Sequence, residues 1–381
     1  MYRRLFNLVP VGVLIALVAA QLASARDADL GKKPPKIQVA IFLDTSNSMD
    51  GLINQARAQL WKIVNDLALA KYDGKRPDLE VALYEYGNTR LDSKTHWVRM
   101  VMPLTTDLDK FSESLFALKT SGGSEYCGAV IAAATRELEW SDDKNSLKMI
   151  FIAGNEPFSQ GPIAYGESCK AAAGRNITIS TIFCGPIETG VATGWQHGAQ
   201  LADGSFSSID QNKAVVAIAA PQDKELAELN TRLNNTYCAY GARERREEFA
   251  QRQLAQDANA AQSSAGAART GFKASAQYRN ADFDLIDAVN EKKVKLEEVK
   301  AEELPENLQK LSKAELAKYV ADQAAERKAV QEKIQELNKA RDAYVASVRK
   351  KESSEEGAGL DRAIIETTRQ QAQKRNFQYE K

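Results

Sequence analysis

The fold is decided by the stretch Ile37-Gln38-Val39-Ala40-Ile41-Phe42-Leu43-Asp44-Thr45-Ser46-Asn47-Ser48. Its first seven residues form a short apolar run, which is typical of a strand buried in a parallel sheet. The segment from Asp44 to Asp50 is polar and indicates a turn. From Leu52 to Lys71, apolar residues recur at the spacing of an amphipathic helix. The sequence therefore predicts a strand, a polar loop and a helix in direct succession.

The same alternation continues along the first half of the chain. Further strands are predicted at residues 79–86, 97–102, 147–153, 176–184 and 205–209. Helical stretches fall between most of them, at residues 108–118, 126–140, 164–174, 193–202 and 222–238. This order predicts an α/β, Rossmann-like fold, in which helices cover both faces of a mainly parallel central sheet. In such sheets, ligands bind at the carboxyl ends of the strands.

A compact polar motif, Asp44-x-Ser46-x-Ser48, follows the first predicted strand. One carboxylate and two hydroxyls in a tight loop suit a hard divalent cation, which takes oxygen ligands and retains waters. The same three side chains are also good helix caps. The motif alone leaves both interpretations open.

In its hydrophobic frame, the motif resembles the first conserved segment of the von Willebrand factor type A domain. The matching segments lie at residues 41–49, 118–124, 149–154 and 176–182, within a domain predicted to span residues 36–240. The resemblance is to the bacterial secreted or periplasmic type with a helical C-terminal region. It implies a single metal ion whose open coordination position accepts an acidic side chain from a protein partner. Members of that family mostly mediate adhesion and assembly rather than catalysis.

Two positions depart from the family pattern. Ser124 stands where a Thr is usual and keeps the hydroxyl, whereas Gly154 stands where an Asp is common and offers no ligand. Glu156 is the expected replacement carboxylate, with Glu125 as the alternative. The resemblance thus implies a site for Mg²⁺, or for Ca²⁺ or Mn²⁺, with these ligands: Asp44, Ser46, Ser48, Ser124 and Glu156. The alternative is a degenerate site that is kept for structure.

The N-terminus has the order of a secretory signal peptide. Arg3 and Arg4 precede an uncharged stretch, residues 5–25, which ends in the small-x-small pattern Ala23-Ser24-Ala25. We therefore predict a signal peptide over residues 1–25, a periplasmic or secreted protein, and no stable membrane anchor after cleavage. An uncleaved anchor is the alternative. Cleavage removes two arginines and leaves 49 basic residues against 51 acidic ones.

Composition limits the function classes. The full chain has equal numbers of basic and acidic residues, 51 of each, so no surplus of Lys and Arg is available for nucleic-acid phosphates. His96 and His197 are the only histidines in the sequence, and no nucleophile motif accompanies either. These counts favour a protein that is not an enzyme.

The four cysteines are too few for a disulfide scaffold, but export would permit disulfides. The type A resemblance places Cys127, Cys169 and Cys184 near the metal-bearing edge of the sheet, and Cys238 at the opposite edge. We therefore expect one bridge among the first three, with Cys238 unpaired or intermolecular. Four buried thiols are the alternative.

Residues 241–381 contain a single proline, Pro305, and long runs of Ala, Glu, Lys, Gln and Arg. They predict a helical arm with a first helix at 242–262, a break at 263–271 and a terminal helix at 360–375 after a linker at 352–359. Ser312 and Glu315 form a capping-box start. The following heptad spacing predicts a possible coiled coil at 312–350, which would allow a homo-oligomer. A helix that packs against its own chain is the alternative.

These features favour a non-enzymatic protein-binding or assembly module of the cell envelope that uses a divalent-cation site. The alternative is a structural or oligomerisation protein that acts through its helical arm and has a degenerate metal site. The identity of the protein partner does not follow from the sequence.

Overall fold

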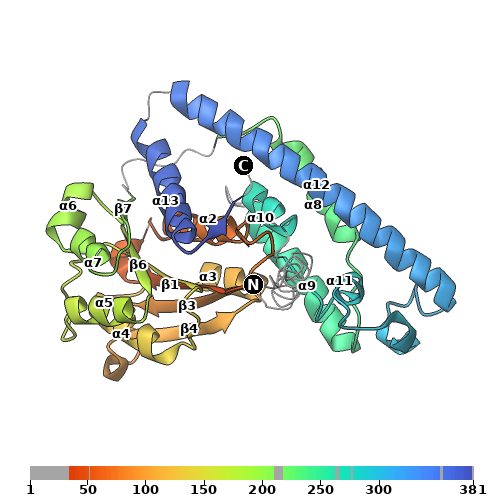
Figure 1. Ribbon diagram of the computed structural model, residues 1–381, viewed down its shortest axis with the longest axis horizontal. Coiled ribbons are helices and arrows are strands. Elements are labelled where there is room, and N and C mark those ends of the chain that lie inside the picture. Colours follow the sequence, from red (N-terminus) through yellow and green to blue (C-terminus); the bar gives the residue numbers. More distant parts are fainter. Residues whose placement is uncertain are drawn as a thin grey trace, which may run out of the picture.

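The computed structural model describes residues 34–50, 52–209, 218–261, 266–275, 278–351 and 355–379. The predicted signal peptide, residues 1–25, lies outside the described residues. Figure 1 shows an α/β domain with helices on both sides of its sheet and a C-terminal half that is built from helices. Within the described residues, no helix is both long and apolar enough to cross a membrane.

The central sheet has six strands in the order β4-β3-β1-β5-β6-β7. Their bounds are β1 Ile37–Asp44, β3 Leu79–Tyr86, β4 Val98–Thr105, β5 Leu147–Gly154, β6 Thr178–Phe183 and β7 Phe206–Ser208. All neighbouring pairs are parallel except β3 and β4, which are antiparallel. Every residue of β1 and β5 is buried, because helices cover both faces of the sheet. The predicted α/β fold with a mainly parallel sheet is confirmed.

Helices and short helical turns connect the strands. Their bounds are η1 Asn47–Met49, α2 Ile53–Leu67, η2 Ser93–Thr95, α3 Leu108–Ala117, α4 Cys127–Glu137, α5 Tyr165–Gly174, α6 Ile187–Ala192, α7 Trp195–Leu201 and α8 Asp223–Asn235. Side chains alternate across the sheet, so that Ile41 and Leu43 enter the core beneath α2 and α3. Ala40 and Phe42 enter the core beneath α4, α5 and α7. The sheet therefore separates two apolar cores.

The expected disulfide is absent from the described residues, where all four cysteines are buried and free. Cys184 packs in the core on one face of the sheet, whereas Cys127 and Cys169 pack in the core on the other face. The sheet thus separates Cys184 from the other two. Cys238 belongs to a third apolar cluster in the C-terminal half. The prediction of one bridge was wrong, and the alternative of four buried thiols describes the structure.

The C-terminal half is helical, as predicted. Its elements are α9 Arg243–Ala261, α10 Gly266–Lys273, α11 Leu285–Asn290, η3 Leu296–Glu298, η4 Ala301–Glu303, α12 Lys313–Lys351, α13 Glu355–Gln373 and β8 Phe377–Gln378. β8 pairs with β2, Lys71–Tyr72, in a separate two-stranded sheet. Helix α10 occupies part of the predicted break, because Phe272 packs edge-on against Trp61 with 5.2 Å between ring centroids. Helix α13 begins at Glu355, inside the predicted linker.

Helix α12 packs against its own chain. The predicted capping box is present: the Ser312 backbone N–H donates to Glu315 Oε2 at 2.8 Å, and the Glu315 backbone N–H donates to the Ser312 hydroxyl at 3.3 Å. The predicted seam is buried against the same chain from Leu316 to Ile334, where its most buried apolar residues are Leu316, Val320, Val330 and Ile334, whereas Tyr344 near its end is exposed. The alternative of a helix packed within the chain therefore describes α12, and the structure gives no support to an intermolecular coiled coil.

Ion pairs and hydrogen bonds attach the C-terminal half to the sheet domain. Arg369 of α13 binds the carboxylate of Asp66 in α2, with Nε 3.0 Å from Oδ1. Asp109 of α3 accepts hydrogen bonds from Arg269 at 2.8 Å and from the Tyr278 hydroxyl at 2.6 Å. The division of the chain at residues 240 and 241 stays a prediction.

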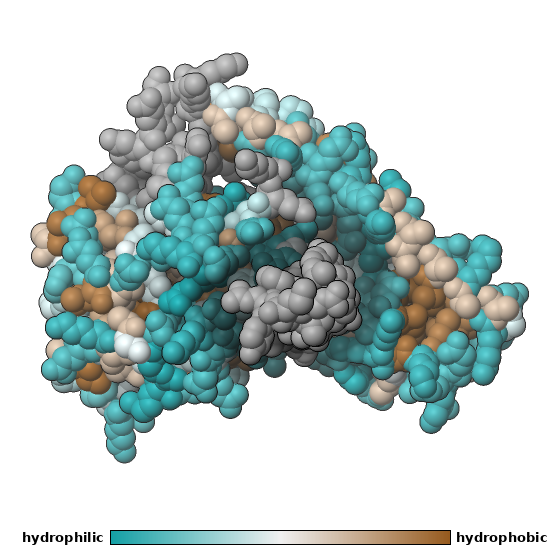
Figure 2. All heavy atoms as spheres, viewed as in Figure 1, coloured by the Kyte–Doolittle hydropathy of each residue, from teal (hydrophilic) through white to brown (hydrophobic). Residues whose placement is uncertain are grey.

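The surface seen in Figure 2 is mostly hydrophilic. One place where apolar side chains gather is α6, where Ile187 and Val191 are 51% and 45% exposed. Helix α6 follows the carboxyl end of β6. It therefore lies at the same edge of the sheet as the carboxyl ends of the parallel strands β1 and β5.

Candidate metal centre

The strand order places a crevice at one point of the sheet edge. The sheet extends from β1 through β3 to β4 in one direction, and from β5 through β6 to β7 in the other. The carboxyl ends of β1 and β5 therefore flank the switch point at which doubly wound sheets bind ligands. Asp44 is the last residue of β1, and Gly154 is the last residue of β5. The predicted motif thus begins at this crevice.

The loop after β1 gathers the three motif side chains. The Ser46 backbone N–H donates to Asp44 Oδ1 at 2.8 Å, and the hydroxyls of Ser46 and Ser48 lie 2.8 Å apart. Two backbone hydrogen bonds tie this loop to the Gly-rich turn before α4: Asn47 N–H to the Gly122 carbonyl at 2.7 Å, and Ser121 N–H to the Thr45 carbonyl at 2.9 Å. The two loops therefore form one rigid rim of the crevice.

Asp44 is fully buried, and its Oδ2 has no hydrogen-bond partner among the described residues. Burial and, to a smaller extent, the charge of Glu125 raise the pKa of Asp44 to about 7, against the hydrogen bonds from Ser46 and from the Asn155 backbone. None of the interactions that shift this pKa comes from a Lys or Arg of the described chain. The carboxylate therefore lacks a protein cation.

Glu125 is the second buried carboxyl group at the crevice. Burial raises its pKa, and the charge of Glu156 raises it further. Gly87 allows Glu125 and Asp44 to approach each other: a Cβ at that position would lie 2.8 Å from Asp44 Oδ1 and 2.9 Å from Glu125 Cγ. Its φ of +78° also favours glycine. The alternative ligand named from the sequence, Glu125, is therefore the one that acts directly on Asp44.

Ser124 and Glu156 are both half-buried at the same edge. Ser124 lies in the Gly-rich turn, next to Gly123. This turn is close to the motif, because a Cβ placed on Gly123 would lie 3.0 Å from Ser46 Cβ. The Glu156 carbonyl accepts a hydrogen bond from Trp195 Nε1 at 2.8 Å. Among the described residues, no hydrogen bond joins the side chain of Ser124 or Glu156 to the Asp44 motif. The structure brings these two predicted ligands to the crevice but not into contact with the motif.

Sequence reasoning missed Asn155. The Ser48 hydroxyl donates to Asn155 Oδ1 at 3.0 Å, and Asn155 Nδ2 donates to the Ser48 carbonyl at 3.4 Å. The signal was present in the sequence, since Asn155 is the first polar residue after a buried strand. Gly154 has no side chain that could bind a metal. A larger residue does not fit at this position, because its Cβ would lie 2.4 Å from the Tyr86 hydroxyl. That hydroxyl is fixed by its 3.0 Å hydrogen bond to the Ala153 carbonyl.

The donor atoms at this crevice are oxygens. Across the described residues, no three His, Cys, Asp or Glu side chains are placed to hold a metal ion together. A cation here would therefore need hydroxyl, amide and water oxygens beside the Asp44 carboxylate. Such a donor set suits Mg²⁺, Ca²⁺ or Mn²⁺ better than Zn²⁺, which prefers nitrogen and sulfur ligands. The unpartnered Asp44 Oδ2 fits a hard divalent cation.

No protein-family model and no curated protein sequence matches this chain. Several solved structures are similar to it. The conserved hypothetical protein BatB from Bacteroides thetaiotaomicron has a TM-score of 0.36 and 17% identity, over 46% of this chain and 90% of that chain. The SpRpn10 VWA domain has a TM-score of 0.33 and 18% identity, over 46% of this chain and 89% of that chain.

Proximal thread matrix protein 1 from the mussel byssus, with a zinc-occupied MIDAS motif, has a TM-score of 0.35 and 10% identity. The match covers 48% of this chain and 43% of the mussel chain. The strand order by itself makes the chain an α/β doubly wound protein. One of the solved structures similar to it is, by its title, a VWA domain.

Proposed function

We propose that this protein is a non-enzymatic binding module of the cell envelope that holds a divalent cation, Mg²⁺ or alternatively Ca²⁺ or Mn²⁺. The observation that carries the proposal is the fully buried Asp44 carboxylate, whose Oδ2 has no partner in the described chain. A buried charge without a counter-charge is unfavourable. A bound cation at Oδ2 would neutralise it.

Each nearby side chain has a role in this proposal. Asp44, Ser46 and Ser48 would supply the main oxygen ligands. Glu125 would supply the second carboxylate, because its charge acts on Asp44. Ser124, Asn155 and Glu156 would act at longer range, and Asn155 would do so by orienting the Ser48 hydroxyl through their 3.0 Å hydrogen bond.

A protein partner is the proposed ligand of the cation's open position, through an acidic side chain. The half-exposed Ile187 and Val191 of α6 support this, since they add apolar surface at the same edge of the sheet. His197 does not suggest catalysis: its Nδ1 lies 2.8 Å from the Tyr165 hydroxyl, which fits packing between α5 and α7. The predicted signal peptide supports a periplasmic or secreted setting.

The rival function, oligomerisation through the helical arm with a degenerate metal site, has less support. An intermolecular coiled coil needs an apolar seam that is free to meet a second chain. In α12 the most apolar part of that seam, including Val330 and Ile334, is already buried against α8 and α10. The arm would have to detach from its own chain before it could pair.

The first test compares the thermal unfolding of metal-free protein with and without Mg²⁺, Ca²⁺ or Mn²⁺. We expect at least one ion to raise the melting temperature of the wild type, because a ligand that binds only the folded state stabilises it. Asp44→Asn should lose this response. Without metal, Asp44→Asn should melt no lower than the wild type, because the substitution removes an uncompensated charge.

Asp142→Asn is the matched control, because Asp142 is exposed and precedes β5 at the opposite edge of the sheet. It should respond to the cation as the wild type does. A wild-type melting curve that none of the three ions shifts would contradict the proposal. So would an Asp44→Asn variant that responds as strongly as the wild type.

A further inference from the structure

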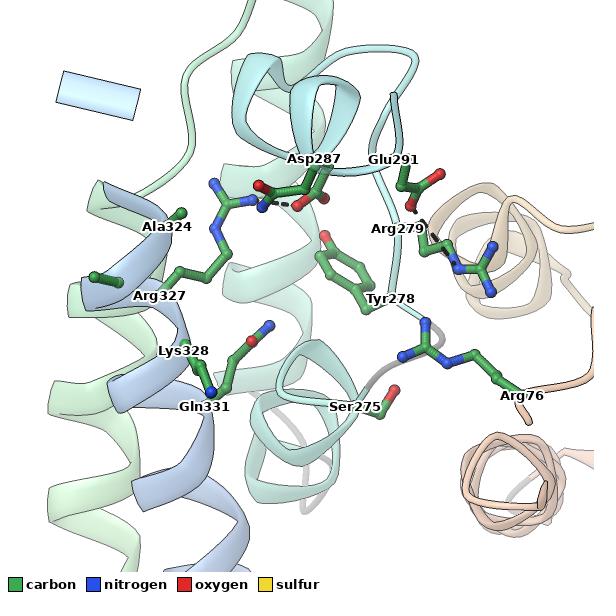
Figure 3. Close-up of a pocket in the computed structure, with 12 residues that line it drawn as sticks. Arg76, Ser275, Tyr278, Arg279, Asp287, Glu291, Ala324, Arg327, Lys328 and Gln331 are labelled. Atoms are coloured by element: carbon green, nitrogen blue, oxygen red, sulfur yellow. Dashed lines mark hydrogen bonds and ion pairs between the residues drawn. The ribbon is translucent and has the colours of Figure 1, made fainter. Parts of the chain in front are cut away.

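A second candidate site lies far from the metal centre. The cavity in Figure 3 is formed by the loop between β2 and β3, by Ser275 and residues 278–291, and by α12. Its volume is about 450 Å³, within the range of small-molecule sites. Arg76 lies three residues before β3, and β3 runs parallel to β1. The cavity therefore faces the edge of the sheet opposite to the one that carries Asp44.

The walls of the cavity carry more positive than negative charge. Its ionisable lining residues, apart from Tyr278, are Arg76, Arg279, Arg327, Lys328, Asp287 and Glu291. Arg327 is already neutralised, because its Nη1 lies 2.7 Å from Asp284 Oδ2 and also pairs with Asp287. The charge available to a ligand therefore comes from the other three cations.

Arg76 and Arg279 lie beside each other at one side of the cavity (Figure 3). Arg279 Nε is 3.9 Å from Glu291 Oε1, a distance at the outer limit of an ion pair. Arg76 is half-buried and makes no ion pair or side-chain hydrogen bond within the described chain. Its burial, and then the charge of Arg279, lower the pKa of Arg76 to about 10. Glu291 is the carboxylate that acts on both groups, so two neighbouring guanidinium groups share one carboxylate and are short of negative charge.

The opposite wall is formed by α12. Lys328 is exposed there, next to Arg327, and has no ion pair with any described residue. The Tyr278 ring lies between this wall and the two arginines (Figure 3), and Ala324 adds a further apolar surface. The cavity thus combines cationic groups on both sides with an apolar middle.

We propose that this cavity binds a small organic anion, whose carboxylate or phosphate group is held by Arg76 and Arg279. The planar guanidinium fork matches both oxyanions and can bind either through two parallel hydrogen bonds. Lys328 would contact a second polar group of the ligand, and the ligand's body would lie against Tyr278. A bound anion would connect the sheet domain to α12. The proposal does not depend on the metal centre.

The test uses the full chain in buffer from which metals have been removed by chelating resin. Succinate and inorganic phosphate are titrated separately at constant ionic strength, with chloride as the reference, and binding is measured by calorimetry and by the melting temperature. We expect saturable binding of at least one of the two oxyanions. Tighter binding of succinate would assign a carboxylate ligand, and tighter binding of phosphate would assign a phosphate ligand.

Arg76→Gln should weaken the binding about tenfold or more, because it removes a charge-assisted contact. Lys328→Gln, an exposed substitution that does not threaten folding, should weaken it by a smaller factor. Arg90→Gln removes an exposed arginine elsewhere and should bind as the wild type does. Asp44→Asn should also bind normally. The proposal is overturned if neither oxyanion binds more tightly than chloride, or if Arg76→Gln and Lys328→Gln both bind as the wild type does.

Discussion

Two fully buried carboxylates, one in each half of the molecule, differ in whether a cation neutralises them. In the C-terminal half, Asp284 is fully buried and lies 2.7 Å from Arg327. At the sheet edge, Asp44 is equally buried, but the ionisable side chain that acts on it is another carboxyl group, Glu125. Asp284 thus has a cation from its own half, whereas Asp44 has none among the described residues.

This difference gives the metal proposal its physical basis. A buried ion pair satisfies both of its charges when the geometry is good, so a site such as Asp284 with Arg327 needs nothing from solution. Asp44 has hydrogen bonds from the Ser46 region but no counter-charge, and one of its oxygens has no partner in the described chain. A carboxylate in that state is either protonated or bound to a cation from solution.

The largest effect is expected from breaking the pair in the helical half. Arg327→Met should lower the free energy of unfolding by about 3–5 kcal/mol, because it leaves Asp284 charged and buried. Urea unfolding of the purified chain measures this. Adding Asp284→Asn to Arg327→Met should recover most of the loss. At the sheet edge we expect no such loss: without metal, Asp44→Asn should be at least as stable as the wild type.

A control on the same helix, α12, separates burial from charge. Arg232 of α8 also pairs with a residue of α12, Glu326, at 2.6 Å, but both side chains are largely exposed. Arg232→Met should therefore cost no more than about 1 kcal/mol. If the two arginine variants lose the same stability, then burial does not determine the energy of these ion pairs. The argument that buried Asp44 needs a cation would then fail.

The role of Arg327 also shows where prediction from sequence stops. In the heptad spacing of α12, this arginine looks like a weak point in an apolar seam. Its partner Asp284 lies 43 residues earlier in the chain, and no local pattern connects the two. By contrast, the strand predicted at residues 79–86 has the bounds of β3, because its aliphatic and aromatic residues, such as Val81, Leu83 and Tyr84, are typical of a buried strand.

A pH titration of Lys273 gives the next largest effect. This lysine is fully buried and pairs with Asp257 at 3.3 Å, and burial lowers its pKa to about 8. Between about pH 8 and the ordinary lysine pKa near 10.5, the unfolded chain therefore binds more protons than the folded one. The stability of the wild type relative to Lys273→Met should rise across that range, by up to about 3 kcal/mol.

Urea unfolding of both proteins at several pH values checks this prediction. The buried tyrosines, such as Tyr278, titrate in both proteins, so their contribution cancels in the difference. A stability difference that stays constant from pH 8 to pH 10.5 would mean that Lys273 keeps its proton in the folded state. The ion pair with Asp257 would then outweigh the effect of burial on Lys273.

At the sheet edge, sequence spacing could not choose between the two replacement carboxylates. Glu125 and Glu156 both lie within two residues of a position where the family pattern has a metal ligand, and both are named from that resemblance. The structure separates them through Gly87, whose missing side chain lets the end of β3 pass close to both Asp44 and Glu125. Asp44, Gly87 and Glu125 are each about 40 positions apart in the chain, so no local sequence motif predicts that they lie close together.

The smallest effect is expected from this choice of carboxylate. Glu125→Gln should weaken Mg²⁺ binding at least about tenfold, because it removes the proposed second carboxylate and the loss of even an outer-shell partner costs that much. Glu156→Gln should change the affinity by no more than about threefold, because its charge acts on Glu125 rather than on Asp44. Titration of the melting temperature with Mg²⁺ gives both affinities. If Glu156→Gln has the larger effect, then the carboxylate assigned from sequence is the ligand, and Glu125 is an ordinary buried acid beside an already complete site.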